Sequence, residues 1–164
     1  MRNVTKIVVH LTAVVASLLL SSVHTWNRYH ERMLIIVKPD GVAAGHASDI
    51  FDILRNDTGI KLVTESRIPL AALEVLQQHY SEHTGREFFP SLVEYMQSGE
   101  IVASIWEGEI GSIEKVRATV GATDPAKAAP GTIRARFGTS VQRNVIHASD
   151  SAKSAEREIK IWFR

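Results

Sequence analysis

Five consecutive apolar residues constrain the fold of this chain more than any other segment. The run Met33-Leu34-Ile35-Ile36-Val37 has the length of a β-strand, and Lys38-Pro39-Asp40-Gly41 stops it, because the proline and the glycine end the strand and turn the chain. A strand with no polar alternation leaves neither face in water. The run therefore predicts a central strand that other elements cover on both sides.

The rest of the chain supplies such elements, because strand-length apolar runs alternate with segments of helical period. Ser48 and Asp49 can cap a first helix, and Asn56-Asp57-Thr58-Gly59 is expected to end it. Further strands are expected at 60–68, 101–106 and 141–147, and further helices at 70–80, around 92–96, at 112–120 and after Ser149 or Asp150. The segment 121–140 lacks periodicity and predicts a long ordered loop, an element that often binds ligands.

This order of elements predicts an α+β fold, a ferredoxin-like sandwich with a four-stranded antiparallel sheet and helices packed on it. The 164 residues are enough for one domain with a proper core. A net charge of +1 argues against bulk nucleic acid or an anionic membrane surface as a partner. Because cysteine is absent, catalysis must come from histidine, lysine, carboxylates or hydroxyls.

The first 32 residues differ in kind from the remainder. They carry a basic start and a mostly apolar stretch from Ile7 to Val23, with no acidic residue before Glu31. Two interpretations remain open: a targeting segment (signal peptide, membrane anchor or organelle leader), or an extension that is disordered or artefactual, the true start then being Met33. We treat 1–32 as an N-terminal extension and 33–164 as the domain. The expected location is cytoplasmic, with membrane contact only if the extension is a retained anchor.

His147 is the leading candidate for a reactive group. It lies between an apolar run and a polar segment that starts a helix, where an imidazole can reach the mouth of a cleft, although a structural role fits the same spacing. His79 and His83 stand four apart on an expected helix, but they lack the glutamate placement of the H-E-x-x-H zinc motif and a third ligand. No protein metal site is therefore expected. No P-loop occurs, so phosphate would have to be recognised by side chains.

Six motifs stand in order between residue 38 and the C-terminal helix. They are Lys38-Pro39-Asp40-Gly41, Tyr80 with Phe88-Phe89, Val116-Arg117 with Gly121-x-Thr123-Asp124-Pro125, Pro130-Gly131-Thr132-Ile133-Arg134, Asn144-Val145-Ile146-His147-x-Ser149-Asp150-Ser151, and Ser154-Ala155-x-x-Glu158-Ile159. Together, in this order and spacing, they resemble the nucleoside diphosphate kinase family. The resemblance covers the chain from Met33 to its end.

The resemblance implies a ping-pong phosphotransferase with broad base specificity. His147 would take the γ-phosphate of a nucleoside triphosphate, typically ATP, and pass it from a phosphohistidine to a nucleoside diphosphate. Mg²⁺ would enter on the nucleotide phosphates rather than on protein ligands. The family also implies a homotetramer or a homohexamer.

The resemblance assigns the phosphate end of the site to five residues. Lys38 would lie near the phosphates and ribose. Arg117, Thr123 and Arg134 would hold the terminal phosphates, and Asn144 would contact the ribose and the phosphate end. A phosphoryl transition state spreads negative charge over its oxygens, so positioned cations and donors suit it.

The other end of the site would bind the base and orient the nucleophile. Phe88 would stack on the base, which any nucleobase allows. Tyr80 would support the site beside His147, and Glu158 would orient the imidazole with help from Ser149. These assignments depend on the motifs occurring together, because each residue alone fits an ordinary surface or core position.

One departure from the family and two rival functions need testing. Ala148 stands where the family usually has glycine, and a positive φ there would introduce strain. A nucleotide-sensing module without catalysis would not need His147 together with Glu158. A single-stranded RNA-binding sheet would need exposed aromatics in an RNP-type motif, which the sequence does not show.

Overall fold

The computed structural model describes residues 30–163. The interpretations offered for the N-terminal extension therefore lie, apart from its last three residues, outside the described residues. Among the residues that are described, no helix has the length and apolar character needed to cross a membrane.

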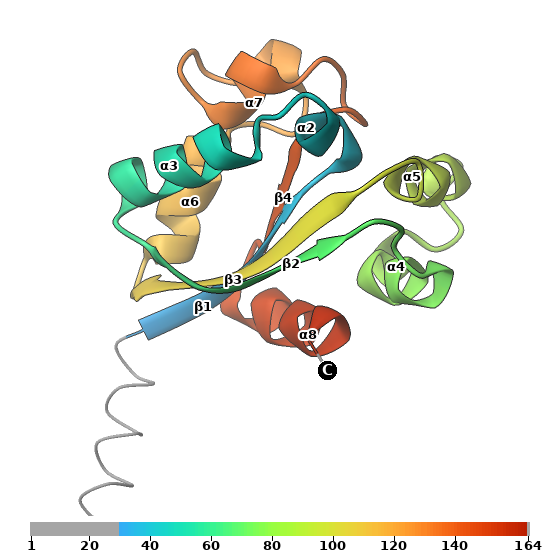
Figure 1. Cartoon of the computed structure of the whole chain (residues 1–164), viewed down its shortest axis with the longest axis horizontal. Coiled ribbons are helices and arrows are strands. Elements are labelled where there is room, and N and C mark those ends of the chain that lie inside the picture. The colour runs from blue at the N-terminus through green and yellow to red at the C-terminus, as the bar shows by residue number, and fades with distance from the viewer. Residues whose placement is uncertain (1–29, 164) are drawn as a thin grey trace, which may run out of the picture. The chain divides into compact units, whose positions relative to one another are not determined.

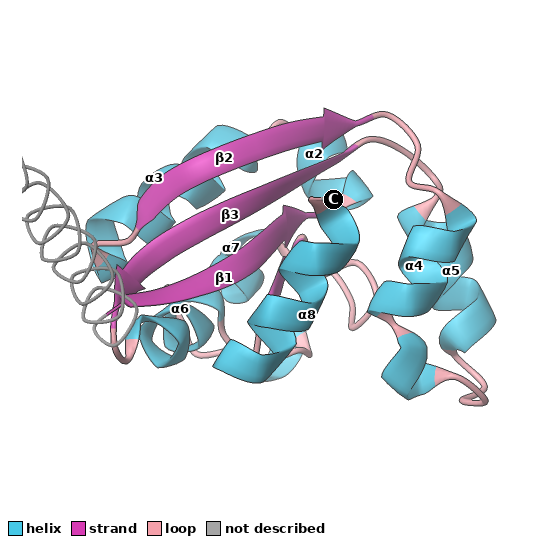
Figure 2. Ribbon diagram, turned by 90° about the horizontal axis from the view of Figure 1, so that it is seen from below, coloured by secondary structure: helices cyan, strands magenta, loops and turns pink. Residues whose placement is uncertain are grey.

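A four-stranded antiparallel sheet forms the centre of the described part, in the order β2-β3-β1-β4 (Figures 1 and 2). Its strands are β1 (His30–Val37), β2 (Lys61–Ile68), β3 (Ile101–Glu109) and β4 (Ile146–Ala148). The apolar run that begins at Met33 therefore lies in an inner strand of the sheet, as predicted. The ferredoxin-like α+β arrangement is confirmed.

Helices cover both faces of this sheet. Helices α3 and α6 lie over one face and α8 crosses the other, while α4 and α5 stand together at one end (Figures 1 and 2). The helices are α2 (Pro39–Ala43), α3 (Ala47–Thr58), α4 (Leu73–His79), α5 (Phe89–Met96), α6 (Ser112–Val120), α7 (Ile133–Phe137) and α8 (Ala152–Trp162), with 3₁₀ turns η1 (Ser81–His83) and η2 (Pro125–Lys127).

Two apolar clusters explain why β1 has no polar alternation. Met33, Ile35 and Val37 point into the cluster beneath α3 and α6, whereas Leu34 and Ile36 point into the cluster beneath α4, α5 and α8. Successive side chains of a strand face opposite sides, so a strand between two cores needs apolar residues throughout. All five side chains are at most 1% exposed.

Several element boundaries differ from the sequence prediction. Strand β1 begins at His30 rather than Met33, and the Glu31 carboxylate accepts a hydrogen bond from the Ile113 N–H at the start of α6 (2.9 Å). Helix α3 begins at Ala47 without a side-chain cap, so the expected caps Ser48 and Asp49 lie inside it. Its end at Gly59, where φ is 76°, is as predicted because glycine tolerates this conformation.

The segments around the C-terminal strand also differ. The expected loop 121–140 contains η2 and α7, and the Thr132 hydroxyl caps α7 by accepting from the Ala135 N–H. Strand β4 is limited to Ile146–Ala148 rather than 141–147. Helix α8 is capped by Ser151, not by Ser149 or Asp150, and this leaves Ser149 available for another contact.

Candidate active site

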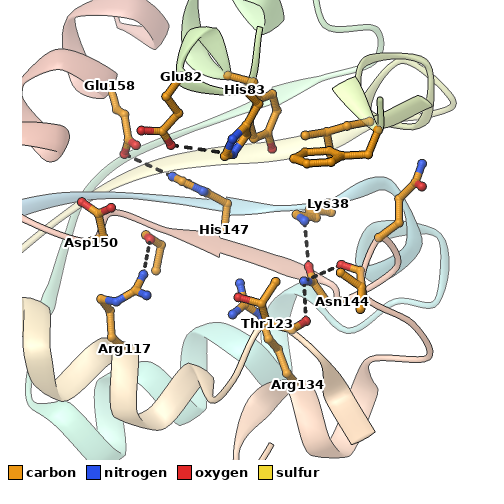
Figure 3. A pocket seen from close by; sticks show the side chains of 16 residues that line it. Lys38, Glu82, His83, Arg117, Thr123, Arg134, Asn144, His147, Asp150 and Glu158 are labelled. Carbon is orange, nitrogen blue, oxygen red and sulfur yellow. Dashed lines mark hydrogen bonds and ion pairs between the residues drawn. The ribbon is translucent and has the colours of Figure 1, made fainter. Parts of the chain in front are cut away.

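A cavity of about 500 Å³ opens beside β4 (Figure 3). All the site residues expected from the sequence line it, except Ser149, which lies behind Glu158. Seven further residues line the cavity: Glu82, His83, Leu92, Val141, Gln142, Ala148 and Asp150. The end of β1, helices α6, α7 and α8, and β4 thus bring residues distant in sequence to one place.

A buried amide organises the phosphate end predicted from the sequence. The Lys38 ammonium donates to Oδ1 of Asn144 (2.7 Å), while Nδ2 of Asn144 donates to the backbone carbonyls of Thr123 and Val141 (both 2.9 Å). Figure 3 shows these contacts converging on Asn144. The 1% exposed asparagine therefore fixes both the lysine and the loop on the far wall.

Two arginines complete the cationic side of the cavity. Arg134 is held by the carbonyls of Gly121 (3.0 Å) and Ile146 (2.9 Å), and Arg117 reaches the carbonyl of Ala148 (3.4 Å). Burial and the nearby charge of Arg117 lower the pKa of Arg134 to about 10, so it remains a cation at neutral pH.

The pKa of Lys38 is also lowered. Burial, and secondly the charge of Arg134, lower its pKa from 10.5 to about 8, while Asp40 acts in the opposite direction. Within residues 30–163, none of Lys38, Arg117 and Arg134 forms an ion pair with a carboxylate. Gathering cations without opposite charges beside them is costly, and an anion bound in the cavity would offset that cost.

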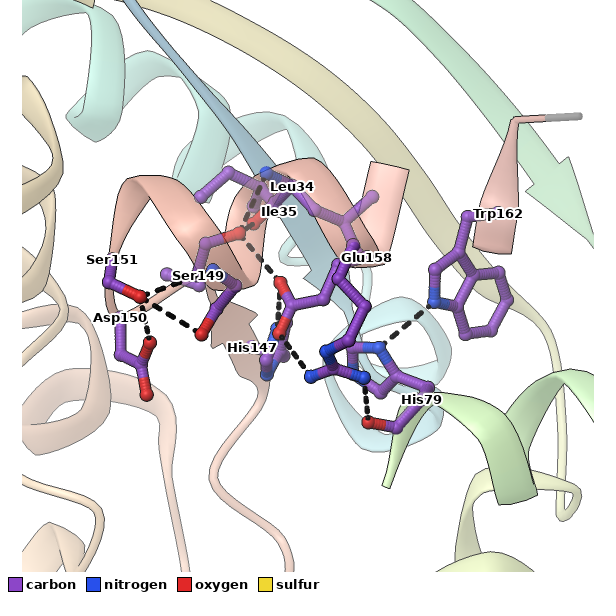
Figure 4. A network of polar contacts seen from close by, with 12 residues as sticks. Leu34, Ile35, His79, His147, Ser149, Asp150, Ser151, Glu158 and Trp162 are labelled. Carbon is purple, nitrogen blue, oxygen red and sulfur yellow. Dashed lines mark hydrogen bonds and ion pairs between the residues drawn. The ribbon is translucent and has the colours of Figure 1, made fainter. Parts of the chain in front are cut away.

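His147 stands opposite this cationic wall, with its side chain 21% exposed. Its Nε2 lies 3.1 Å from Oε2 of Glu158, and the same oxygen accepts a hydrogen bond from the Ser149 hydroxyl (2.6 Å) (Figure 4). The Leu34 N–H donates to Ser149 (3.0 Å) and fixes that hydroxyl. Because a carboxylate only accepts, Nε2 carries the proton and the lone pair of the neutral ring lies on Nδ1. The contact with Glu158 thereby leaves Nδ1 as the ring nitrogen with an available lone pair.

His79 packs against the His147 ring. The two imidazoles make an edge contact with centroids 4.5 Å apart, and the Trp162 indole N–H donates to Nδ1 of His79 (3.2 Å) (Figure 4). An indole nitrogen can only donate, so this nitrogen is unprotonated. Burial, and secondly the charge of His147, hold the pKa of His79 well below its usual range. His79 is therefore a neutral packing partner.

His79, His147 and Glu158 place potential metal-ligating atoms within 4.8 Å of one another. Each already has a hydrogen-bonding role: Glu158 accepts from His147, and His79 accepts from Trp162. A zinc ion would hold such ligands at about 2.0–2.2 Å and would need their lone pairs free. The cluster is better described as a hydrogen bond between His147 and Glu158, with the His79 ring packed against His147. His83, which stands four residues after His79 in the sequence, is not part of it.

The opposite end of the cavity is apolar and open. Phe88 is 50% exposed and Val141 is 56% exposed, and both side chains line the same cavity. His83 packs against Phe88 with ring centroids 5.3 Å apart. Two exposed apolar surfaces on one cavity suit a flat aromatic ligand.

The sequence did not predict several residues that line the cavity or contact His147. The sequence predicts a strand at Val141, whereas in the structure Val141 precedes β4 and lines the cavity. His79 was considered only as a metal ligand. Ala148 does not have positive φ, because Val145 is the only described non-glycine residue that does, so the strain considered for Ala148 is absent.

A family model and curated relatives of known function both match this chain. The family model described as nucleoside diphosphate kinase matches residues 31–164. The nucleoside diphosphate kinase of Saccharomyces cerevisiae is 48% identical over 134 residues, which cover 82% of this chain and 86% of that protein.

Solved structures give the same result. A crystal structure of the Aquifex aeolicus nucleoside diphosphate kinase has a TM-score of 0.77 and 41% identity over 82% of this chain and 96% of its own. The Encephalitozoon cuniculi enzyme has a TM-score of 0.77 and 35% identity, over 81% of this chain and 88% of its own.

Proposed function

The chain belongs to the nucleoside diphosphate kinase family of phosphotransferases, and on this basis we propose that it works by a ping-pong mechanism through Nδ1 of His147. The observation that carries the proposal is that Nδ1 of His147 shares a cavity with Lys38, Arg117 and Arg134, which within residues 30–163 form no ion pair with a carboxylate. A nucleoside triphosphate would supply the negative charge that the wall needs. A nucleoside diphosphate would then take up the transferred group.

In the first half-reaction, the Nδ1 lone pair attacks the γ-phosphorus and the bond from that phosphorus to the β–γ bridging oxygen breaks. The bonding electrons leave with the nucleoside diphosphate. The ring keeps its proton on Nε2 and so becomes cationic, and the Glu158 carboxylate at 3.1 Å stabilises that charge. In the second half-reaction, a terminal oxygen of another diphosphate attacks the same phosphorus and the N–P bond breaks. The ring returns to its neutral form.

The cationic wall would stabilise the charge that spreads over the transferred group. Arg117, Arg134 and Thr123 would bind the terminal phosphates, and Lys38 would reach phosphate and ribose oxygens. Asn144 holds Lys38 and two backbone segments in place, so few of these groups need to reorganise during transfer. Pre-set donors of this kind are the main source of catalysis in phosphoryl transfer.

The apolar end of the cavity would hold the base. Phe88 would stack on one face of the base, with Val141 beside it on the same cavity. Stacking depends on the π-face that every base has, which fits broad base specificity. Tyr80, buried beside His147 with ring centroids 6.5 Å apart, would limit how far the imidazole can rotate.

The cavity suits a magnesium ion that arrives on the nucleotide. Its wall carries three carboxylates, Glu82, Asp150 and Glu158, and each already contacts a neighbouring side chain. Among residues 30–163, none of these carboxylates forms an ion pair with Lys38, Arg117 or Arg134. Mg²⁺ held by the phosphate oxygens would neutralise part of their charge while the side chains orient the phosphates.

Labelling with γ-³²P-ATP and magnesium tests the mechanism. The wild type should carry a phosphate that is labile in acid and stable in alkali, and any nucleoside diphosphate should remove it. His147→Ala should carry none, whereas His83→Ala, which keeps Nδ1 of His147, should still be labelled. Label on the His147→Ala variant, or acid-stable label on the wild type, would refute the proposal.

Assembly and domain extent are further parts of the proposal. Residues 33–164, together with the first residues of β1, would form the kinase domain. The outer strand β2 presents an edge that is available for pairing, and its Val63 is 44% exposed. This supports a homotetramer or a homohexamer, which sedimentation would distinguish.

A further inference from the structure

The backbone just before His147 adopts an unfavourable conformation. Val145 has a φ of 61°, and the Ile146 N–H donates to the carbonyl of Asn144 (2.8 Å). A hydrogen bond between residues two apart, around a central residue of positive φ, is a tight γ-turn of the rare and strained kind. For a β-branched residue this is a true outlier. Something outside the turn must hold it.

The turn has a clear consequence for the site. Successive side chains of a strand alternate, so residues three apart normally face opposite sides. Asn144 and His147 are three apart, yet both line the cavity, while the intervening Val145 and Ile146 are buried. The turn at Val145 is what allows the lysine-binding amide and the nucleophile to share one cavity.

The segment after β1 binds both backbone polar groups of Val145. The Val145 N–H donates to Oδ2 of Asp40 (3.2 Å), and the Val145 carbonyl accepts from the Lys38 N–H (2.8 Å). A side chain at Gly41 would meet the Val145 carbonyl at 3.0 Å, so the glycine permits this close approach. The register of β1 and β4 places Val37 opposite Ile146, beside these contacts.

The Asp40 carboxylate is itself held in place. Its Oδ1 accepts from the Tyr95 hydroxyl of α5 (2.5 Å) and from the Gly41 N–H (2.9 Å). Burial, and secondly the bond to Asp40, raise the pKa of Tyr95, so the phenol keeps its proton and donates. Asp40 does not line the cavity and would not touch the nucleotide.

We propose that Asp40 is a positioning residue, whose carboxylate, oriented by Tyr95, holds Val145 in its strained turn and thereby places His147 for phosphoryl transfer. This inference rests on the proposed function. It assigns Asp40 a role in the rate of phosphorylation of His147 that is separable from nucleotide binding. A residue that only stabilised the first turn of α2 would have no separate effect on the rate of phosphorylation.

The test measures single-turnover phosphorylation of His147 and the dissociation constant of ADP. Asp40→Asn keeps the shape of the side chain but replaces one acceptor oxygen by a donor. It should slow phosphorylation at least tenfold, with the dissociation constant changed by less than threefold. Tyr95→Phe should slow it by less. Asp52→Asn, at an exposed aspartate that pairs with Arg55, is the matched control and should leave the rate unchanged.

Rescue distinguishes positioning from general support of the fold. Glycine adopts positive φ without strain, whereas alanine does not. Adding Val145→Gly to Asp40→Asn should therefore recover at least threefold in rate, and adding Val145→Ala should recover none. Glycine removes more of the buried side chain than alanine does, so a loss of packing alone would predict the opposite order.

Equal effects of glycine and alanine, or an Asp40→Asn variant that phosphorylates at the wild-type rate, would overturn the inference. If Asp40→Asn does not fold, Tyr95→Phe with the same two second changes decides the question in the same way. Absence of phosphohistidine in the wild type would instead refute the proposed function, so the two failures are distinguishable.

Discussion

Lys38 should destabilise the folded protein at neutral pH, and replacing it should reveal by how much. Its side chain is buried, with 6% of its surface exposed, and its pKa is lowered from 10.5 to about 8, mainly by burial and secondly by Arg134. The difference corresponds to about 3 kcal/mol against the charged form in the folded state. Lys38→Met removes the charge and keeps most of the apolar stem.

The direction in which the free energy of unfolding changes with pH depends on which state binds more protons. Below pH 8 the amine is protonated in both the folded and the unfolded state, so the cost is present in full. Between about pH 8 and 10.5 the unfolded state binds more protons, so stability rises with pH. The wild type should therefore gain about 2–3 kcal/mol relative to Lys38→Met between pH 7 and pH 10. Groups that do not interact with Lys38 titrate equally in both proteins and cancel.

Urea unfolding at pH 7, 8, 9 and 10, at one protein concentration, measures this difference. Lys153→Met, at an exposed lysine of α8, is the matched control and should run parallel to the wild type. Loss of a charge-assisted phosphate contact of about 1.5–3 kcal/mol should also slow phosphorylation of His147 in Lys38→Met about 10- to 150-fold. Parallel stability curves for the wild type and Lys38→Met would refute the reasoning.

Two further substitutions probe the two ends of the cavity. Glu158→Gln keeps an oxygen near His147 but loses the charge that pairs with the phosphorylated ring, so single-turnover phosphorylation should slow about 5- to 30-fold; an unchanged rate would exclude Glu158 from this role. Phe88→Ala should raise KM for ATP, GTP, CTP and UTP by a similar factor, about 5- to 150-fold, because stacking is worth about 1–3 kcal/mol per base. Steady-state assays with all four triphosphates would contradict stacking if only one base were affected.

Much of the site was predictable because its residues stand in short motifs. Co-linearity of the motifs around Lys38, Arg134 and His147 predicted the family, and the comparisons confirmed it. The contribution of His79 was not predictable in this way. Its contact with Trp162 joins residues 83 apart, and nothing in the local pattern of either residue indicates it.

The predicted ends of strands and helices were wrong where tertiary contacts override local preference. Residues 141–145 have the composition of a strand, but the Asn144 amide bonds to the carbonyls of Thr123 and Val141 and ends the pairing before Ile146. The expected cap Ser149 is instead directed at Glu158. Ser151 caps α8 in its place.

The sequence by itself determined the buried strand, the order of elements and the types of side chain available for chemistry, because hydrophobic period and turn residues act over short distances. Only the tertiary structure decided which nitrogen of His147 is free and why Asn144 shares its cavity. Those outcomes depend on the contacts of Glu158 with His147 and of Asp40 with Val145, the latter 105 residues apart. Hydrogen-bond geometry between distant segments exists only once the chain has packed around its two cores.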